Sequence, residues 1–285
     1  MKRPWIIRQV SDEGSSTPFV ARLWVGLFEL RDQILPHRFG TPNGEARRKD
    51  FDALYEPVRL SLTTARKAGH RIGELVSDHR KKVQEGSILR IDKTAVHISE
   101  TIDGALHDQF ATFLNSSSRA FRGVQDVVHF FGIDIGFLYA NDANFNEGIE
   151  RLRGARNDTL AEFLISTRKQ WSATFTQRRI SLEHEGWTLP NIEHNVMADR
   201  KIDIREPEID GKPVSLYVRD VFNALASFIE NIVVYSFQAA LKPDLGIFEI
   251  PAAKRDPNYC KRFEVWHPIM GTQKWTLYYC EDDLF

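Results

Sequence analysis

Residues 106–131 read LHDQFATFLNSSSRAFRGVQDVVHFF, and this stretch decides the fold. Its apolar side chains recur every three or four positions, the spacing that places them on one face of an α-helix. The resulting seam, in which Ser117 is the one polar member, consists of Leu106, Phe110, Phe113, Ser117, Phe121, Val124, Val128 and Phe131. A helix of this length makes about seven turns. Its apolar stripe therefore predicts neighbouring helices that cover it.

Three more helices are predicted downstream of this seam. Apolar residues at the same spacing indicate helices near 145–153, 159–185 and 213–241. Pro213 favours the start of the last one, because proline is tolerated in the first turn of a helix. Together with a helix over 99–131, these segments predict a helical bundle.

The two ends of the chain predict additions to this bundle. Two helices precede it, one that Pro36 stops and one near 57–84 that Pro57 opens. The segments RFEVWHPI and KWTLYY flank MGTQ within residues 262–279, which predicts a terminal β-hairpin. The predicted fold class is mainly α, a helical bundle with an N-terminal helical pair and a small C-terminal β-hairpin. The expected regions are a basic N-terminal helical region (1–93), the bundle (94–245) and the hairpin appendage (246–285).

The composition excludes several classes of protein. The chain has 285 residues and a formal net charge of −1, so no strong overall field directs it to nucleic acid or membrane. No apolar run reaches the length of about 18 residues that spans a bilayer, and MKRPWIIRQV lacks the apolar block of a signal peptide. A cytoplasmic protein without membrane contact is expected. The charge is uneven, because residues 1–93 carry 18 Lys and Arg against 12 Asp and Glu.

Motifs for metals, cofactors and nucleotides are missing. The sequence has no GxxxxGK[ST], GxGxxG, HExxH or GxSxG pattern. Its two cysteines, Cys260 and Cys280, fall in the predicted hairpin and suit neither a disulfide framework nor a zinc site. We therefore expect no cofactor and no bound metal.

Candidate functional residues gather at the end of the predicted 159–185 helix, in QWSATFTQRRISLEHEGWTLP (170–190). Arg179 and His184 are separated by four residues, and the aliphatic Leu182 stands two positions before the histidine. This arrangement resembles the RxxxxH motif of the HEPN superfamily of all-α domains, and the helical bundle fits the scaffold of that family. A second pair, Arg122 and His129, lies on one face of the 106–131 helix.

The resemblance implies a metal-independent endoribonuclease. It also implies a biological role as a toxin or a host-defence effector. It also implies a homodimer with a composite cleft and RNA as the partner. In such a site His184 would act as general acid or base, and Arg179 or Arg178 would hold the phosphate. Trp187 would stack on a base, as aromatic side chains do in single-stranded RNA sites.

A second interpretation of the same residues is structural. Five residues along a helix turn by about 500°, so Arg179 and His184 would point about 140° apart unless the helix ends between them. Arg179 and Glu183 are four residues apart and suit an ion pair along the helix. Gly186 suits the end of the helix, with His184 and Trp187 packed around it. The chain would then be a non-catalytic RNA- or protein-binding scaffold, with the basic helix near 57–84 as a contact surface.

Overall fold

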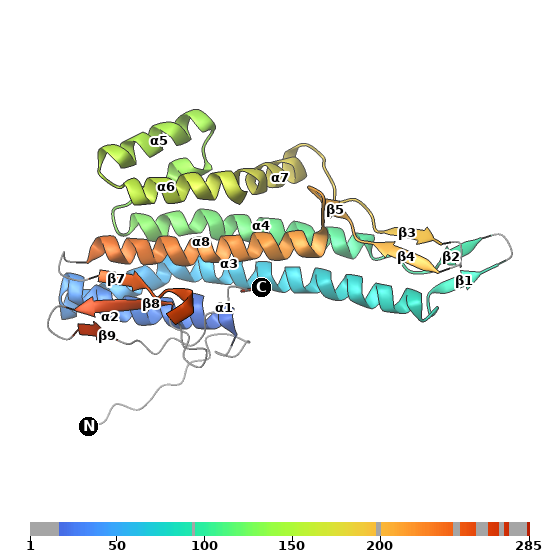
Figure 1. Cartoon of the computed structure of the whole chain (residues 1–285), viewed down its shortest axis with the longest axis horizontal. Coiled ribbons are helices and arrows are strands. Elements are labelled where there is room, and N and C mark those ends of the chain that lie inside the picture. The colour runs from blue at the N-terminus through green and yellow to red at the C-terminus, as the bar shows by residue number, and fades with distance from the viewer. Residues whose placement is uncertain are drawn as a thin grey trace, which may run out of the picture. The chain divides into compact units, whose positions relative to one another are not determined.

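The computed structural model describes residues 17–92, 95–197, 201–241, 246–254, 262–267, 271–273 and 284–285. These residues form long helices and short antiparallel strand pairs, which confirms the mainly α fold class (Figure 1). They pack into two compact units. Unit 1 contains residues 1–59, 124–135 and 226–284, and unit 2 contains residues 60–123, 136–225 and 285. Three long helices each contribute residues to both units.

Those three helices are α3 (Thr41–Gln84), α4 (Asp103–His129) and α8 (Val214–Ala240). Unit 1 adds the helical elements α1 (Pro18–Val20), η1 (Ala21–Gly26), α2 (Leu27–Phe39) and η4 (Ala252–Lys254), and a sheet of β7 (Gly246–Glu249), β8 (Phe263–His267) and β9 (Gly271–Gln273). Unit 2 adds η2 (Gly136–Tyr139), α5 (Asp142–Gly154), α6 (Asp158–Thr167), η3 (Arg168–Ser172) and α7 (Ala173–His184). Its strand pairs are β1 (Leu89–Ile91) with β2 (Val96–Ile98), β3 (Glu193–Val196) with β4 (Ile202–Arg205), and β5 (Glu208–Ile209) with β6 (Lys212–Pro213).

Prolines do not bound the N-terminal helices as the sequence predicts. Pro36 lies inside α2, and Pro57 lies inside α3. The break falls instead at Gly40, whose φ of 77° is accessible to glycine at the end of a helix. A proline inside a helix costs about 3 kcal/mol, and the buried residues on both sides of Pro57, such as Tyr55 and Val58, supply packing that opposes this cost.

The predicted 159–185 helix is one helical run with a change of pitch in the middle. Residues of α6, η3 and α7 follow one another without a break (Figure 1), and η3 is a π-helical turn. The N–H of Ala173 donates to the carbonyl of Arg168, five residues earlier. Such turns insert a residue into the helical ladder and are frequent at functional sites. They leave no mark in the apolar spacing of the sequence.

The terminal hairpin is confirmed in the part that the structure describes. Strands β8 and β9 pair antiparallel, with His267 opposite Gly271, so Gly271–Gln273 form a strand where the sequence predicts the turn MGTQ. Strand β7, which the sequence analysis missed, pairs with the other edge of β8. The segment KWTLYY and both cysteines lie outside the described residues.

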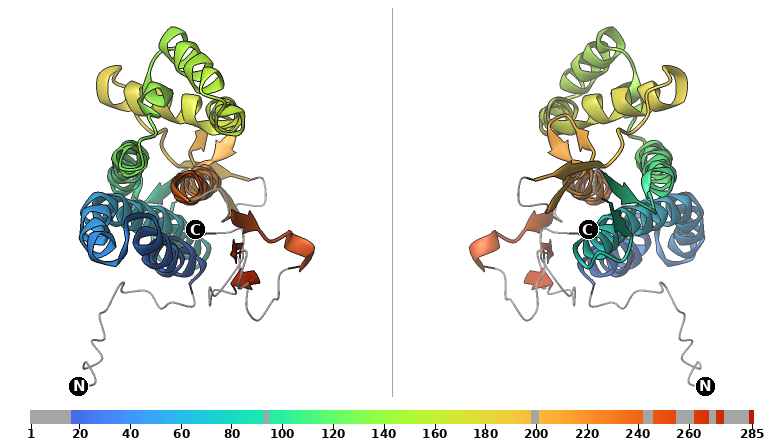
Figure 2. Two further views of the ribbon diagram at one scale, coloured as in Figure 1. Left: turned by 90° about the vertical axis from the view of Figure 1, so that its left-hand side faces the viewer. Right: turned by 90° about the vertical axis from the view of Figure 1, so that its right-hand side faces the viewer.

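The first part of the predicted seam, from Leu106 to Phe121, lies in the core of unit 2, and its last three residues belong to unit 1. Leu106, Phe110, Phe113 and Ser117 of α4 have no exposed surface. Phe121 continues the stripe and meets three rings, at centroid distances of 4.7 Å to Tyr139, 5.1 Å to Trp171 and 6.3 Å to Phe175. This aromatic contact holds η3 and α7 on α4. Helix α5 packs beside α6 (Figure 2).

Close packing around α5 yields a stability prediction. A Cβ added at Gly148 would lie 2.1 Å from Cγ of Phe137, whereas one added at Gly154 would meet nothing within 4 Å. Gly148→Ala should lower the free energy of unfolding by about 1–3 kcal/mol, because the core must move to accept a methyl group. Gly154→Ala, the matched control, should change stability by less than about 1 kcal/mol. Urea unfolding of both variants measures the difference, and equal effects would contradict the close contact.

Candidate functional site

Three of the four residues that the sequence selected lie on α7, and the fourth, Trp187, follows its C-terminal end. The helix continues through His184, so it does not end between Arg179 and His184. Gly186, with φ of 70°, ends it. The N–H groups of Glu185 and Trp187 then donate to the carbonyl of Ser181, at 3.2 and 3.1 Å. A glycine in the left-handed conformation is a common end of a helix, and its place here confirms the predicted helix end.

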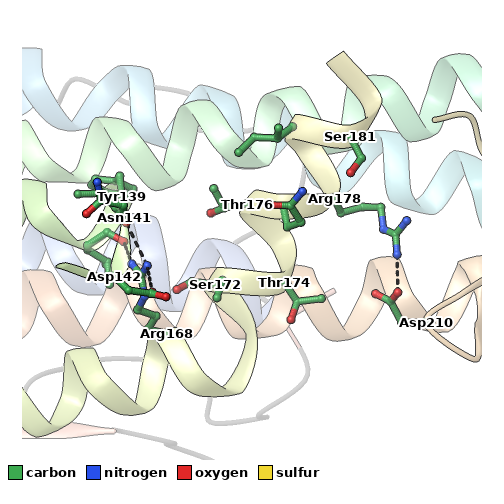
Figure 3. A pocket seen from close by; sticks show the side chains of 15 residues that line it. Tyr139, Asn141, Asp142, Arg168, Ser172, Thr174, Thr176, Arg178, Ser181 and Asp210 are labelled. Atoms are coloured by element: carbon green, nitrogen blue, oxygen red, sulfur yellow. Dashed lines mark hydrogen bonds and ion pairs between the residues drawn. The ribbon is translucent and has the colours of Figure 1, made fainter. Parts of the chain in front are cut away.

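Each of the two arginines is engaged in an ion pair. Arg179 pairs with Glu183 one turn along α7, with Nη2 at 2.6 Å from Oε2. Arg178 pairs with Asp210, as Figure 3 shows, and its guanidinium lies 4.6 Å from the ring centroid of Trp187. The Arg179–Glu183 pair is the one that the structural interpretation predicts. Within one chain, therefore, a phosphate would have to compete with a carboxylate for either arginine.

His184 and Trp187 have different surroundings. The side chain of His184 is 70 % exposed, and its Nε2 lies 3.7 Å from Oε2 of Glu183. Trp187 is half-buried and packs edge-on against Phe110 of α4, at a centroid distance of 6.0 Å. Glu183 thus stands between the arginine and the histidine of the motif. The imidazole is accessible to solvent, whereas the indole ring is already covered in part by Arg178.

A hollow between α4 and α7 brings further arginines to Arg179. We call it the arginine hollow; it has a volume of about 230 Å³ and is lined by Asn115, Ser118, Arg119, Arg122, Arg179 and Glu183. Arg119 and Arg122 are exposed, and among the described residues neither has an acidic partner. Three guanidinium groups and one carboxylate leave the hollow with a net positive charge. The sequence pattern paired Arg122 with His129 and did not point to Arg119. The signal available for Arg119 was its spacing of three residues from Arg122, on the polar side of α4 next to the apolar seam.

A larger groove runs along another side of α7 (Figure 3). Its volume is about 850 Å³, and hydroxyl groups of Ser172, Thr174, Thr176 and Ser181 are among its lining. Arg168 donates to the carbonyls of Leu138 and Ala140 and to the carboxylate of Asp142, at 3.1, 3.0 and 2.7 Å. Its charge therefore fixes the segment before α5. With Arg178 paired to Asp210 as well, the groove presents neutral polar groups rather than open cations.

Asp210, the ion-pair partner of Arg178, lies in a tight turn close to the buried Tyr217. Asp210 has φ of 52° and Gly211 has φ of 76°, which are the positive values that a two-residue hairpin turn requires. Burial and, to a smaller extent, the charge of Asp210 raise the pKa of Tyr217 to about 12. The hydroxyl of Tyr217 has no hydrogen-bond partner within the described part of the chain. Tyr217 therefore stays protonated, and its role is in packing.

The basic face of α3 is more nearly neutral than its composition suggests. Arg71 pairs with Glu74, Lys81 with Glu85, and Lys82 with Glu100, at 2.9, 3.9 and 2.6 Å. These carboxylates cancel most of the charge that the sequence assigned to this surface. Arg119 and Arg122 of the arginine hollow are thus less compensated than these cations of α3.

Two further properties concern metals and membranes. No group of three or more His, Cys, Asp or Glu side chains that could hold a metal ion occurs among the described residues. No helix in the same part of the chain is both long and apolar enough to cross a membrane.

The comparisons with known proteins yield no relative. No protein-family model matches the sequence, no curated protein matches it, and no solved structure matches the fold.

Proposed function

We propose that this protein binds RNA through the arginine hollow between α4 and α7. The observation that carries the proposal is the convergence of Arg119, Arg122 and Arg179 on one open hollow with a single carboxylate. A guanidinium group forms two parallel hydrogen bonds with phosphate oxygens, so a set of three suits a phosphate backbone. Asn115 and Ser118 supply neutral hydrogen-bonding groups in the same hollow.

Single-stranded RNA fits this site better than a protein partner does. The hollow is lined by polar side chains throughout, whereas the centre of a protein interface is depleted of charge and rich in apolar contacts. A flexible phosphate backbone can follow a surface that offers cations without a fixed groove. Glu183 remains paired with Arg179 until a phosphate competes for the guanidinium.

Removing the two unpaired arginines tests the proposal. The double variant Arg119→Ala/Arg122→Ala should bind fluorescent single-stranded RNA about tenfold or more weakly than wild type at low salt. The slope of log affinity against log salt should fall by about 1.4, because each lost phosphate contact on a single strand contributes about 0.7. Fluorescence anisotropy over a series of salt concentrations measures both quantities.

The matched control lies on α3. Arg71→Ala/Lys81→Ala removes the same amount of charge from residues that are already paired with Glu74 and Glu85, and it should leave RNA affinity within about twofold. Loss of binding in the control but not in the hollow variant would place RNA on α3. Wild-type protein that binds no RNA would overturn the proposal and favour a protein partner.

A metal-independent endoribonuclease is the second candidate function, and the exposure of His184 favours it. An accessible imidazole beside Glu183 is a side chain of the kind that serves as general acid or base in RNA cleavage. A second copy of the chain would have to bring a cation to this imidazole, because Arg179 is bound to Glu183 within its own helix.

Cleavage of a mixed RNA substrate in EDTA tests this candidate. Wild type should cleave and His184→Ala should not, while both keep the same circular dichroism spectrum. Light scattering on the same samples should show a dimer. Equal cleavage by both proteins, or none by wild type, would refute a catalytic His184 and leave RNA binding as the function.

A further inference from the structure

Two histidines from distant parts of the sequence meet in unit 2. His79 of α3 and His194 of β3 place their Nε2 atoms 2.8 Å apart, with the ring planes inclined at 74°. The His79 residue is only 1 % exposed. A hydrogen bond between two imidazole nitrogens requires one donor and one acceptor. The accepting ring must therefore be neutral, and two protonated rings would face each other as like charges.

This contact holds a small hairpin on the end of α3. A buried apolar cluster joins Val83 and Ile88 to Ile192 and Ile204. The last two residues flank or belong to the β3–β4 hairpin, in which His194 pairs with Ile204. The N–H of Ile192 also donates to Oδ1 of Asp103, at 2.8 Å. The hairpin is thus docked by one apolar cluster, one hydrogen bond to Asp103 and the contact between the two histidines.

The charged groups around the pair are few. Burial lowers the pKa of both histidines, and the proximity of His194 lowers the pKa of His79 further. The charge of Asp103 raises the pKa of both histidines and so opposes these effects. Lys82 lowers and Glu100 raises the pKa of His79, and these two are themselves an ion pair at 2.6 Å. The net effect favours the neutral rings that the hydrogen bond needs.

We infer that His79 and His194 form a pH-sensitive latch that docks the β3–β4 hairpin on α3. The latch is closed while both rings can share one proton, and protonation of both opens it. Because the pKa values in the docked state are lowered, the undocked hairpin takes up protons more readily. Docking is therefore complete above the ordinary histidine pKa of about 6.5, and it weakens as the pH falls below that value.

The opening is confined to the hairpin by a second set of contacts. Glu206, directly after β4, accepts from the N–H of Ser215 at 3.2 Å and lies 3.6 Å from Arg80. The N–H of Val214 donates to the carbonyl of Pro207, at 2.8 Å. Neither set contains a histidine, so the chain stays anchored at 206–207. Release of 192–197 and 201–205 exposes the apolar surface of Val83 on α3 and of Ile88 in the turn that follows it.

Hydrogen exchange of the full chain measures this opening. Peptides covering 192–205 are compared between wild type and His79→Gln/His194→Gln at each pH from 7.5 to 5.5, which cancels the intrinsic pH dependence of exchange. Protection of wild type should fall relative to the double variant, by up to about tenfold per pH unit for each proton taken up. His97→Gln, a substitution of an exposed histidine in the neighbouring β2, should follow wild type.

A second measurement covers the case in which the double variant fails to dock. Nitrogen NMR of the histidine side chains in wild type should show the two rings of the latch titrating below the exposed histidines and in one coupled transition. Independent titration of both rings like exposed imidazoles would overturn the inference. Wild-type protection of 192–205 that matches the double variant at every pH would overturn it as well.

Discussion

Glu230→Gln is expected to lower the free energy of unfolding by about 3–5 kcal/mol, the cost of leaving buried charge without its partner. The Glu230 side chain is 4 % exposed and accepts from Nε of Arg22 at 3.1 and 3.2 Å. Arg262 binds the same carboxylate from the segment that precedes β8. The amide of glutamine keeps the volume but cannot neutralise two guanidinium groups. Urea unfolding monitored by circular dichroism measures the loss.

Glu249→Gln is the matched control for this variant. Glu249 also pairs with Arg262, at 3.0 Å, but its side chain is 50 % exposed. Surface ion pairs contribute at most about 1 kcal/mol, so the control should lose no more than that. Equal losses in the two variants would show that burial of Glu230 does not set the strength of the contact. The difference in unfolding free energy between the two variants also measures how much the contact of Glu230 with Arg22 and Arg262 stabilises the β7–β8–β9 sheet against the helices of unit 1.

Phe121→Ala is expected to lower the free energy of unfolding by about 3–5 kcal/mol, the range for deleting a buried phenyl ring. Phe121 is 2 % exposed and supports Tyr139, Trp171 and Phe175 at once. Its removal leaves a cavity beneath α7. Phe121 is also the residue that immediately precedes Arg122 of the arginine hollow in the sequence. Phe248→Ala, at a phenylalanine that is 54 % exposed, should cost less than about 1 kcal/mol.

The Phe121 variant also links the fold to the proposed site. Because α7 loses its support on α4, Arg179 should move relative to Arg122, and affinity for RNA should fall without any change in charge. Denaturation and anisotropy on the same sample test the two effects together. A variant that loses stability but binds RNA like wild type would show that the hollow does not depend on the position of α7.

The local part of the fold could be predicted from the sequence, and its long-range part could not. The seam from Leu106 to Phe131 and the helix stop at Gly186 follow from spacing and residue type. The prediction that Pro57 starts a helix was wrong, because the packing of buried residues on both sides of Pro57 outweighs the local cost of a proline inside a helix. Residues of α3 far apart in the sequence contribute to different units, and an apolar stripe carries no information about which partner covers it.

The candidate site shows the same division. Arg179 and Glu183, four residues apart, were predictable as an ion pair on a helix. The pairing of Arg178 with Asp210 depends on a turn 32 residues away. The hollow depends on how α7 lies across α4, and so do the positions of Arg119 and Arg179. The contact between His79 and His194 spans 115 residues and has no sequence signal.

The most direct test of the central claim is photo-cross-linking of single-stranded RNA containing 4-thiouridine to the wild-type protein, with the modified peptides identified by mass spectrometry. RNA binding at the arginine hollow predicts cross-links within 115–122 of α4 and 179–187 at the end of α7. Binding with cross-links confined to 67–82 of α3, or binding with none on α4 and α7, would contradict it.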